Sequence, residues 1–202
     1  MMEIPKAWYQ AFLNMLKEHE VATSLKEAAI KGSMGKWTKC LTTVVIKSCK
    51  ELGWSACAKD HVSEFLPISR GEYLGLDIMA FKQDKNGVQS INELGWFFPV
   101  AVFELENRIE NRYIEYSMWK VICTRANLRV VLCYRREPQE GSMLIREIQD
   151  SVFKSLKPDE FKSFENTMIV IGSRNKSDTF PYGFFKDWIL DTQTGKFSRS
   201  NC

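Results

Sequence analysis

The sequence predicts a three-layer α/β/α domain with a central mixed β-sheet. First, the chain has 202 residues, enough for one domain with a full core. Second, segments with helical apolar spacing come first, and strand-like apolar runs then alternate with two further helical segments. Third, the run over residues 99–106 is apolar on both faces until its last three residues. Such a strand belongs to a sheet that is covered by helices on both sides.

The chain begins with two predicted helices, over residues 5–30 and 36–52. Trp8 and Phe12 recur at helical spacing in the first segment. The second has an apolar stripe along one side and is followed by Gly53, a residue that commonly ends helices.

The remaining elements alternate between strands and helices. We expect a short strand over 54–60, longer strands over 73–81, 99–106, 128–134 and 166–172, and helices over 108–126 and 142–157. Asn107 is the expected N-cap of the helix over 108–126. Without a repeat or a dividing linker, we expect one domain over 1–202, made of an N-terminal helical extension (1–35), a core motif region (36–135) and the rest of the sheet with its flanking helix (136–202).

Composition excludes several classes of protein. Hydrophobic residues make up 45% of the chain and charged residues 26%, which excludes disordered and fibrous proteins. The longest apolar run, residues 96–103, falls far short of the about 20 residues that span a bilayer. The first residues lack the apolar stretch of a signal peptide. We therefore expect a cytoplasmic protein without a membrane partner.

Charge and cysteine content limit which residue types can carry out catalysis or bind a metal in this chain. The net charge of +3 is compatible with a polyanionic partner but does not identify one. The six cysteines form no CxxC pair, so we expect reduced and mostly buried thiols rather than a disulfide framework or a zinc site. With two histidines in the chain, a histidine-rich metal site is excluded. Carboxylates and lysines have to supply the chemistry.

Three acids occupy unusual positions. Asp77 lies inside the apolar run 73–81, while Glu104 and Glu106 end the run 99–106. Residues two apart on a strand point to the same face, so Glu104 and Glu106 should lie side by side. Neighbouring buried carboxylates repel each other unless one is protonated or a cation lies between them. Mg²⁺ takes such oxygen ligands together with water and substrate phosphate, so the acids predict a Mg²⁺ site.

Each acid also has a simpler interpretation. Glu104 and Glu106 could emerge into solvent at the end of their strand, with Glu106 paired to Arg108. Asp77 could be a buried carboxylate that accepts hydrogen bonds from backbone amides. The occurrence of all three acids in this order, behind a buried strand, favours the metal site.

This arrangement resembles the PD-(D/E)xK nuclease superfamily, the family of many restriction endonucleases. The resemblance covers residues 36–135 and is carried by the helix over 36–52, Asp77, the segment Glu104-Leu105-Glu106, the helix over 108–126 and the strand over 128–134. It implies a restriction-endonuclease-like fold and a Mg²⁺-dependent endonuclease, for which Mn²⁺ can substitute, acting on DNA. A homodimer and a role in restriction or defence are further family-level expectations.

The resemblance also assigns roles to residues. Asp77 and Glu104 would hold the metal, together with the backbone carbonyl of Leu105. Position 106 would orient or deprotonate the attacking water. This sequence has Glu106 where the family usually has lysine, and Leu76 where it usually has proline. It therefore resembles the family variants with Glu-x-Glu in place of Glu-x-Lys.

The missing lysine could have moved to the helix over 108–126. There Tyr113, Ser117, Lys120 and Thr124 form a stripe opposite the apolar face. If this stripe faces the acids, Lys120 can replace the absent lysine, as happens in some families of the fold. The alternative is that Lys120 lies on the solvent face of the helix.

Two other functions remain open. A degenerate site would make the chain a non-catalytic module that binds nucleic acid or a protein partner, and the change to Glu106 favours this alternative. A glycosidase ranks far below, because acids two apart on one strand are closer than the carboxylate separation of glycosidases. For DNA, we expect one or two phosphate contacts among basic residues, which include Arg125, Arg129, Arg135 and Arg136 beside the strand over 128–134.

Overall fold

The computed structural model describes residues 3–62, 66, 68–82 and 96–200. Its α-helices are α1 (Ile4–Lys17), α2 (His19–Ile30), α3 (Met34–Glu51), α4 (Asn111–Ile122) and α5 (Pro138–Ser151). Two 3₁₀ segments are η2 (Glu160–Phe164) and η3 (Arg174–Thr179). The strands are β1 (Trp54–Ala58), β2 (Ile78–Lys82), β3 (Ala101–Leu105), β4 (Leu128–Arg135), β5 (Thr167–Ser173), β6 (Phe185–Asp191) and β7 (Lys196–Arg199).

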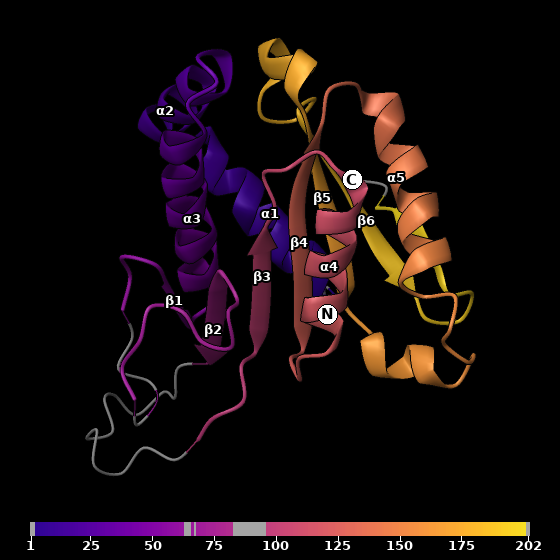
Figure 1. Cartoon of the computed structure of the whole chain (residues 1–202). Coiled ribbons are helices and arrows are strands. Elements are labelled where there is room, and N and C mark those ends of the chain that lie inside the picture. Colours follow the sequence, from indigo (N-terminus) through magenta and orange to yellow (C-terminus); the bar gives the residue numbers. More distant parts are fainter. Residues whose placement is uncertain (1–2, 63–65, 67, 83–95, 201–202) are drawn as a thin grey trace.

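The seven strands form one mixed sheet in the order of the sequence (Figure 1). Strands β3, β4 and β5 are parallel, and the pairs on either side of them are antiparallel. Parallel neighbours need a crossover connection, and here α4 joins β3 to β4 while α5 joins β4 to β5. The helices that follow β3 and β4 thus lie close to the ends of those strands.

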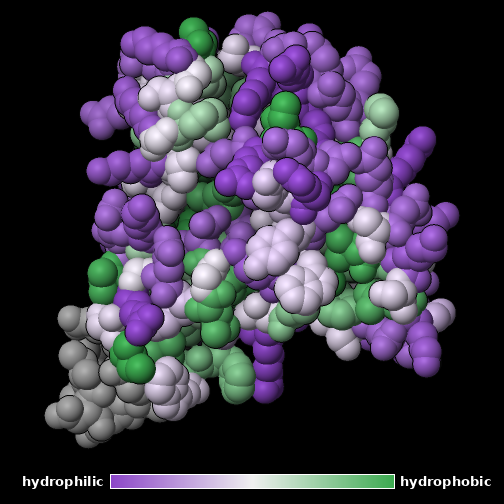
Figure 2. Space-filling view, viewed as in Figure 1, coloured by the Kyte–Doolittle hydropathy of each residue, from purple (hydrophilic) through white to green (hydrophobic). Residues whose placement is uncertain are grey.

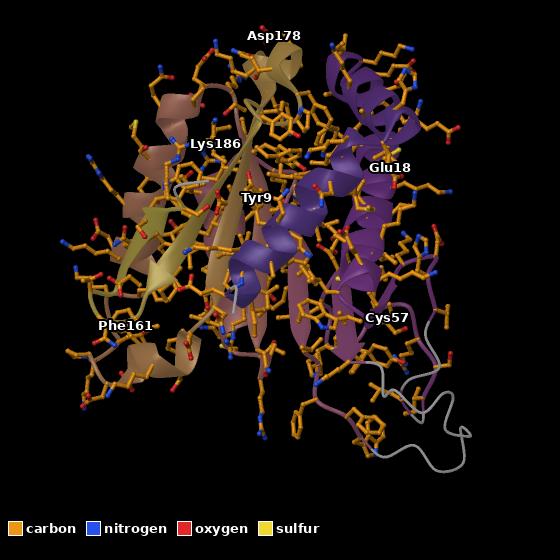
Figure 3. The ribbon with its side chains drawn as sticks, turned by 180° about the vertical axis from the view of Figure 1, so that it is seen from behind. Tyr9, Glu18, Cys57, Phe161, Asp178 and Lys186 are labelled. Carbon is orange, nitrogen blue, oxygen red and sulfur yellow. The ribbon has the colours of Figure 1, made fainter. Side chains whose placement is uncertain are left out.

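Helices cover both faces of the sheet. Helices α1, α2 and α3 pack on one face, where α1 crosses the strands obliquely (Figure 3), and α4 and α5 pack on the other (Figure 1). Side chains of β3 alternate between the layers, with Phe103 in the α1–α3 core and Val102 in the α4–α5 core. The three-layer α/β/α fold with a mixed sheet is confirmed.

The N-terminal helical region differs from the prediction, because the helix expected over 5–30 is two helices. Residues 17–20 are four exposed polar side chains in succession, so no apolar stripe continues across them. The chain turns at Glu18, and α2 buries Leu25 and Ala28 in the same core as Trp8 of α1.

The strand expected over 73–81 begins at Ile78 instead. Leu74 and Gly75 have positive φ values of 55° and 65°, which places them in a turn although the surrounding side chains are apolar. Asp77 therefore lies directly before β2 rather than inside a strand. The prediction that it lies within the strand is wrong by one residue.

Two helix starts also differ from the prediction. Helix α4 begins at Asn111, and Asn107 is not its N-cap, because the amide of Asn107 donates to the hydroxyl of Thr38 on α3 at 2.8 Å. Helix α5 begins at Pro138, earlier than expected, because Glu137 and Glu140 form a capping box there.

The described residues include five of the six cysteines and the helices that could be considered as membrane spans. Of the cysteines within them, Cys49, Cys57 and Cys133 are buried, Cys40 is half-buried and Cys123 is exposed, and all five are free thiols. Cys202 lies outside the described residues. Among the helices of the described ranges, none combines the length and the apolar character needed to cross a bilayer.

Candidate active site

The register between β2 and β3 brings the first two acids together. Ile78 of β2 lies opposite Phe103 of β3 in an antiparallel ladder, so the next opposed positions are 77 and 104. The amide N–H of Asp77 donates to Oε1 of Glu104 at 3.3 Å, and the amide of Leu105 donates to Oδ2 of Asp77 at 2.7 Å. Asp77 and Glu104 are thus joined by hydrogen bonds where β2 begins and β3 ends.

Lys120 reaches this pair from α4. Its ammonium nitrogen Nζ lies 2.8 Å from Oε2 of Glu104 and donates to the carbonyl oxygen of Gly75 at 2.7 Å. Ser117, one turn earlier, is buried and donates its hydroxyl to the same Glu104 oxygen at 3.4 Å. The stripe that contains Ser117 and Lys120 therefore faces the acids, and Lys120 points into the site rather than into open solvent.

Burial and mutual repulsion set the charge state of the acids. Glu104 is 4% exposed. Burial, and next the charge of Asp77, raise the pKa of Glu104 to about 7, although Lys120 opposes the rise. Burial also raises the pKa of Asp77, against the amide of Leu105 and the charge of Lys120. A cation added between the two carboxylates would relieve this destabilisation.

Glu106 lies just beyond the end of β3 and is half-buried. Its Oε1 accepts a hydrogen bond from the backbone amide of Arg108 at 2.8 Å, so it contacts the main chain of Arg108 and not the guanidinium named in the simpler interpretation. Its charge raises the pKa of Asp77, although less than the charge of Glu72 does. Glu106 thus belongs to the same electrostatic cluster as Asp77 and Glu104.

A cavity of about 660 Å³ opens at these acids. Asp77, Glu104, Leu105 and Glu106 line one part of it. The other part is lined by the chain that leads into and along α4, namely Arg108, Arg112, Tyr113, Tyr116, Ser117 and Lys120. The volume lies in the range of small-molecule sites and can admit a phosphate group with its neighbouring sugar.

The donor set at this cavity fits a hard divalent cation. Mg²⁺ prefers oxygen ligands and usually binds through one or two carboxylates plus water and substrate phosphate. Asp77 and Glu104 supply two carboxylates on adjacent strands. Within the described ranges, no group of three or more His, Cys, Asp or Glu side chains is arranged to hold a metal. Two neighbouring carboxylates match the protein ligands that Mg²⁺ usually takes.

Several basic residues have different roles from those expected. Arg129 is buried and donates to the carbonyl oxygens of Thr124 and Glu165. Arg135 is buried and donates to the carbonyl of its neighbour Tyr134 at 2.8 Å. Both arginines are thus bonded to acceptors of the protein itself, and the expectation of one or two phosphate contacts among the basic residues stays a prediction.

Two residues of the cavity wall, Arg112 and Tyr116, were not among the candidates predicted from the sequence. A signal for them was present, because Tyr116 and Lys120 are one turn apart on the same helix. Arg108 was considered as a partner of Glu106 and not as part of the site. Its guanidinium lies 4.1 Å from the ring centroid of Tyr113, which directs it along the cavity wall.

Comparisons with known proteins give a likeness in fold. No protein-family model matches the chain, and no curated protein matches it. NucC of E. coli MS115-1, solved in its cAAA-bound form, matches with a TM-score of 0.51 and 11% identity over 99% of this chain and 84% of that chain. NucC of P. aeruginosa ATCC27853, also cAAA-bound, matches with a TM-score of 0.44 and 11% identity over 100% and 85% of the two chains. The E. coli match shows that this chain shares its mixed-sheet α/β fold with that NucC structure.

Proposed function

We propose that this chain is a Mg²⁺-dependent endonuclease that hydrolyses phosphodiester bonds in DNA. One observation carries the proposal: Asp77 and Glu104 are hydrogen-bonded across adjacent strands, and the ammonium of Lys120 meets them in a cavity. The likeness in fold to NucC agrees with the resemblance of the motifs and supports this class of reaction. Restriction or defence is the proposed setting.

Asp77, Glu104 and the backbone carbonyl of Leu105 would hold the metal. When bound, Mg²⁺ supplies activation of the attacking water and neutralisation of charge on the phosphate, and Mn²⁺ can serve in its place. The protein prepares for this role by holding both carboxylates in fixed orientation. The amide of Leu105 fixes Oδ2 of Asp77, and the hydroxyl of Ser117 approaches Oε2 of Glu104.

Lys120 and Glu106 together take the two roles of the lysine that the family usually has at position 106, which are to orient the attacking water and to accept its proton. An ammonium has three N–H donors, and Lys120 uses two of them on Glu104 and Gly75. The third can orient a water or a phosphate oxygen, but a charged ammonium cannot accept a proton. Glu106 lies on the same cavity, and its carboxylate can accept the proton that the water loses.

A plasmid assay tests the proposal. Supercoiled plasmid is incubated with Mg²⁺ and the wild-type protein, Asp77→Asn or Glu104→Gln. Each substitution keeps the shape of the side chain and removes its charge, so cleavage should fall about 100-fold or more. Asp187→Asn is the matched control, because Asp187 is also a buried acid of the sheet but does not line the cavity. Equal nicking by all four proteins would reject the assignment.

A non-catalytic binding module is the second candidate, and Glu106 in place of lysine favours it. Calorimetric titration with Mg²⁺ and Mn²⁺ separates the two functions. An active site should bind the metal in the wild type and lose that binding in Asp77→Asn. DNA binding without any carboxylate-dependent metal binding would support the module.

A further inference from the structure

Two large aromatic side chains lie exposed on α4 beside the cavity. Tyr116 is 56% exposed and Trp119 is 53% exposed, and their rings stack with centroids 6.0 Å apart at 24°. Aromatic residues supply much of the buried surface of protein cores and interfaces, so an exposed stacked pair on a well-packed helix indicates a binding surface. More than half of each residue remains open to a ligand.

This pair continues directly into the cavity that holds the acids. Tyr116 lines the cavity, and Trp119 lies three residues further along α4, on the adjacent part of the same helical surface. In Figure 2, pale side chains of intermediate hydropathy gather over α4 at the centre of the face, among purple hydrophilic ones. A ligand that occupies the cavity can therefore extend over the two rings.

Positive charge is interleaved with the rings. The guanidinium carbons of Arg108 and Arg112 lie 4.1 Å and 4.8 Å from the ring centroid of Tyr113, and the Lys120 ammonium lies 5.6 Å from that of Tyr116. Within the part of the chain that the structure describes, neither arginine forms an ion pair with a carboxylate. Their charge is thus available to an anionic ligand.

Alternating cationic and aromatic groups suit a chain of nucleotides. Cationic groups contact the phosphates, while aromatic rings stack on bases irrespective of sequence. In a duplex, each base is already stacked and paired, so its face is not accessible to an outside ring. A ring pair on an exposed helix can therefore bind only bases that are unpaired.

We propose that Tyr116 and Trp119 form a stacking platform for unpaired bases of DNA, with Arg108 and Arg112 contacting the phosphates next to the carboxylate site. The preferred ligand is then single-stranded DNA or a strand end that has left its duplex. The link to cleavage rests on the proposed function, but the binding of single strands by the platform does not.

Fluorescence anisotropy in EDTA tests the platform without any cleavage. The probe is a fluorescein-labelled 20-nucleotide strand, measured alone and as a duplex of the same sequence. Tyr116→Ala and Trp119→Ala should each weaken single-strand binding about 5- to 100-fold and change duplex binding less than about twofold. Trp119→Phe keeps an aromatic ring and should retain most of the affinity.

Tyr182→Ala is the matched control. Tyr182 is 55% exposed and has the Lys17 ammonium 5.3 Å from its ring centroid, so it repeats the exposure and the cation contact of Tyr116. Its partner Lys17 belongs to α1, which covers the opposite face of the sheet. This variant should bind the strand as the wild type does. Circular dichroism and thermal melting confirm that each variant is folded before its affinity is compared.

The outcomes separate the platform from the nuclease. An equal loss on single strands and duplex, no loss in either platform variant, or an equal loss in Tyr182→Ala would each overturn the platform. If neither supercoiled plasmid nor single-stranded DNA is cut in Mg²⁺ but single-strand binding depends on Tyr116 and Trp119, the platform stands and the nuclease is rejected. If nicking depends on Asp77 but the platform variants bind normally, the nuclease stands and the platform is rejected.

Discussion

Two buried carboxylates lie in the same sheet, on opposite faces and in different surroundings. Glu104 of β3 is 4% exposed and points to the α4–α5 layer, and Asp187 of β6 is 5% exposed and points to the α1–α3 layer. Burial raises the pKa of both. By burial alone, the two residues cannot be told apart.

Their neighbours distinguish them. Glu104 has Asp77 beside it, the ammonium of Lys120 at 2.8 Å and a cavity of about 660 Å³ in front of it. Asp187 accepts a hydrogen bond from the hydroxyl of Ser200 and lies outside that cavity. Glu104 differs from Asp187 in having a second acid, a cation and open space beside it, and this combination makes it the candidate site residue.

The largest effect on stability should come from Lys120→Met. At pH 8.5 this change leaves Glu104 buried with Asp77 and without its cation, which should lower the free energy of unfolding by about 3 kcal/mol. At pH 5.5 Glu104 is protonated, so the loss should be smaller. Urea denaturation at the two pH values measures the difference.

Lys186→Met is the control for the other carboxylate, because the charge of Lys186 lowers the pKa of Asp187 only as the smallest of several effects. It should cost less than about 1 kcal/mol at both pH values. Similar losses in Lys120→Met and Lys186→Met would remove the distinction between the two carboxylates.

The pH dependence of stability should reveal the raised pKa that Glu104 and Asp187 have in common. The folded pKa of Glu104, about 7, exceeds the ordinary value of 4.5, so the folded state binds this proton more tightly than the unfolded state. The resulting stability is fully present below pH 4.5 and is lost as the pH rises through 7. Glu104→Gln should remove this loss, on the order of 3 kcal/mol, in urea titrations from pH 4.5 to 8 in EDTA.

Asp187→Asn should also flatten the profile, because burial raises the pKa of Asp187 as well. A profile of Glu104→Gln that parallels that of the wild type would contradict the raised pKa of Glu104.

Added Mg²⁺ should distinguish the carboxylate pair of the candidate site from Asp187. At pH 8, a metal concentration 10 to 100 times the dissociation constant should stabilise the wild type by about 1.4 to 2.7 kcal/mol, because the ion binds only the folded pair. Asp77→Asn should lose this stabilisation and Asp187→Asn should keep it. Thermal melting with and without Mg²⁺ gives the comparison, and an identical shift in both variants would place the metal elsewhere.

The smallest effect should come from Asp187→Asn without metal. The amide oxygen of asparagine can still accept the hydrogen bond of the Ser200 hydroxyl. We expect a change of less than about 1 kcal/mol near neutral pH, measured by urea denaturation. A loss of several kcal/mol would show that the charge of Asp187 itself matters to the fold.

The parts of the fold that the sequence could predict are those with a regular apolar pattern. The buried strands β4 and β5 and the helices around them follow from such patterns. Strand β7 could not be predicted in the same way, because its side chains are mostly polar and exposed and it forms by pairing with β6. Pairing of this kind leaves no apolar pattern in the residues of β7 themselves.

Part of the candidate site could also be predicted from the apolar pattern of the sequence. Asp77 and Glu104 stand out because charge is unusual beside apolar runs. The sequence alone does not determine whether Lys120 faces the acids or the solvent, since a helix with two distinct stripes can present either one to the sheet. The burial of Arg135 could not be predicted either, because its hydrogen bond to Asn111 exists only after α4 has packed against the sheet.

The antiparallel ladder between β2 and β3 has a consequence for how this site can vary between related chains. Asp77 stands at the start of one strand and Glu104 near the end of the other, so the chain connecting the two strands joins their far ends. The separation of the two carboxyl groups is fixed by the strand register and not by the length of that connection. A change that shifts this register, in which Ile78 lies opposite Phe103, would move the two acids apart.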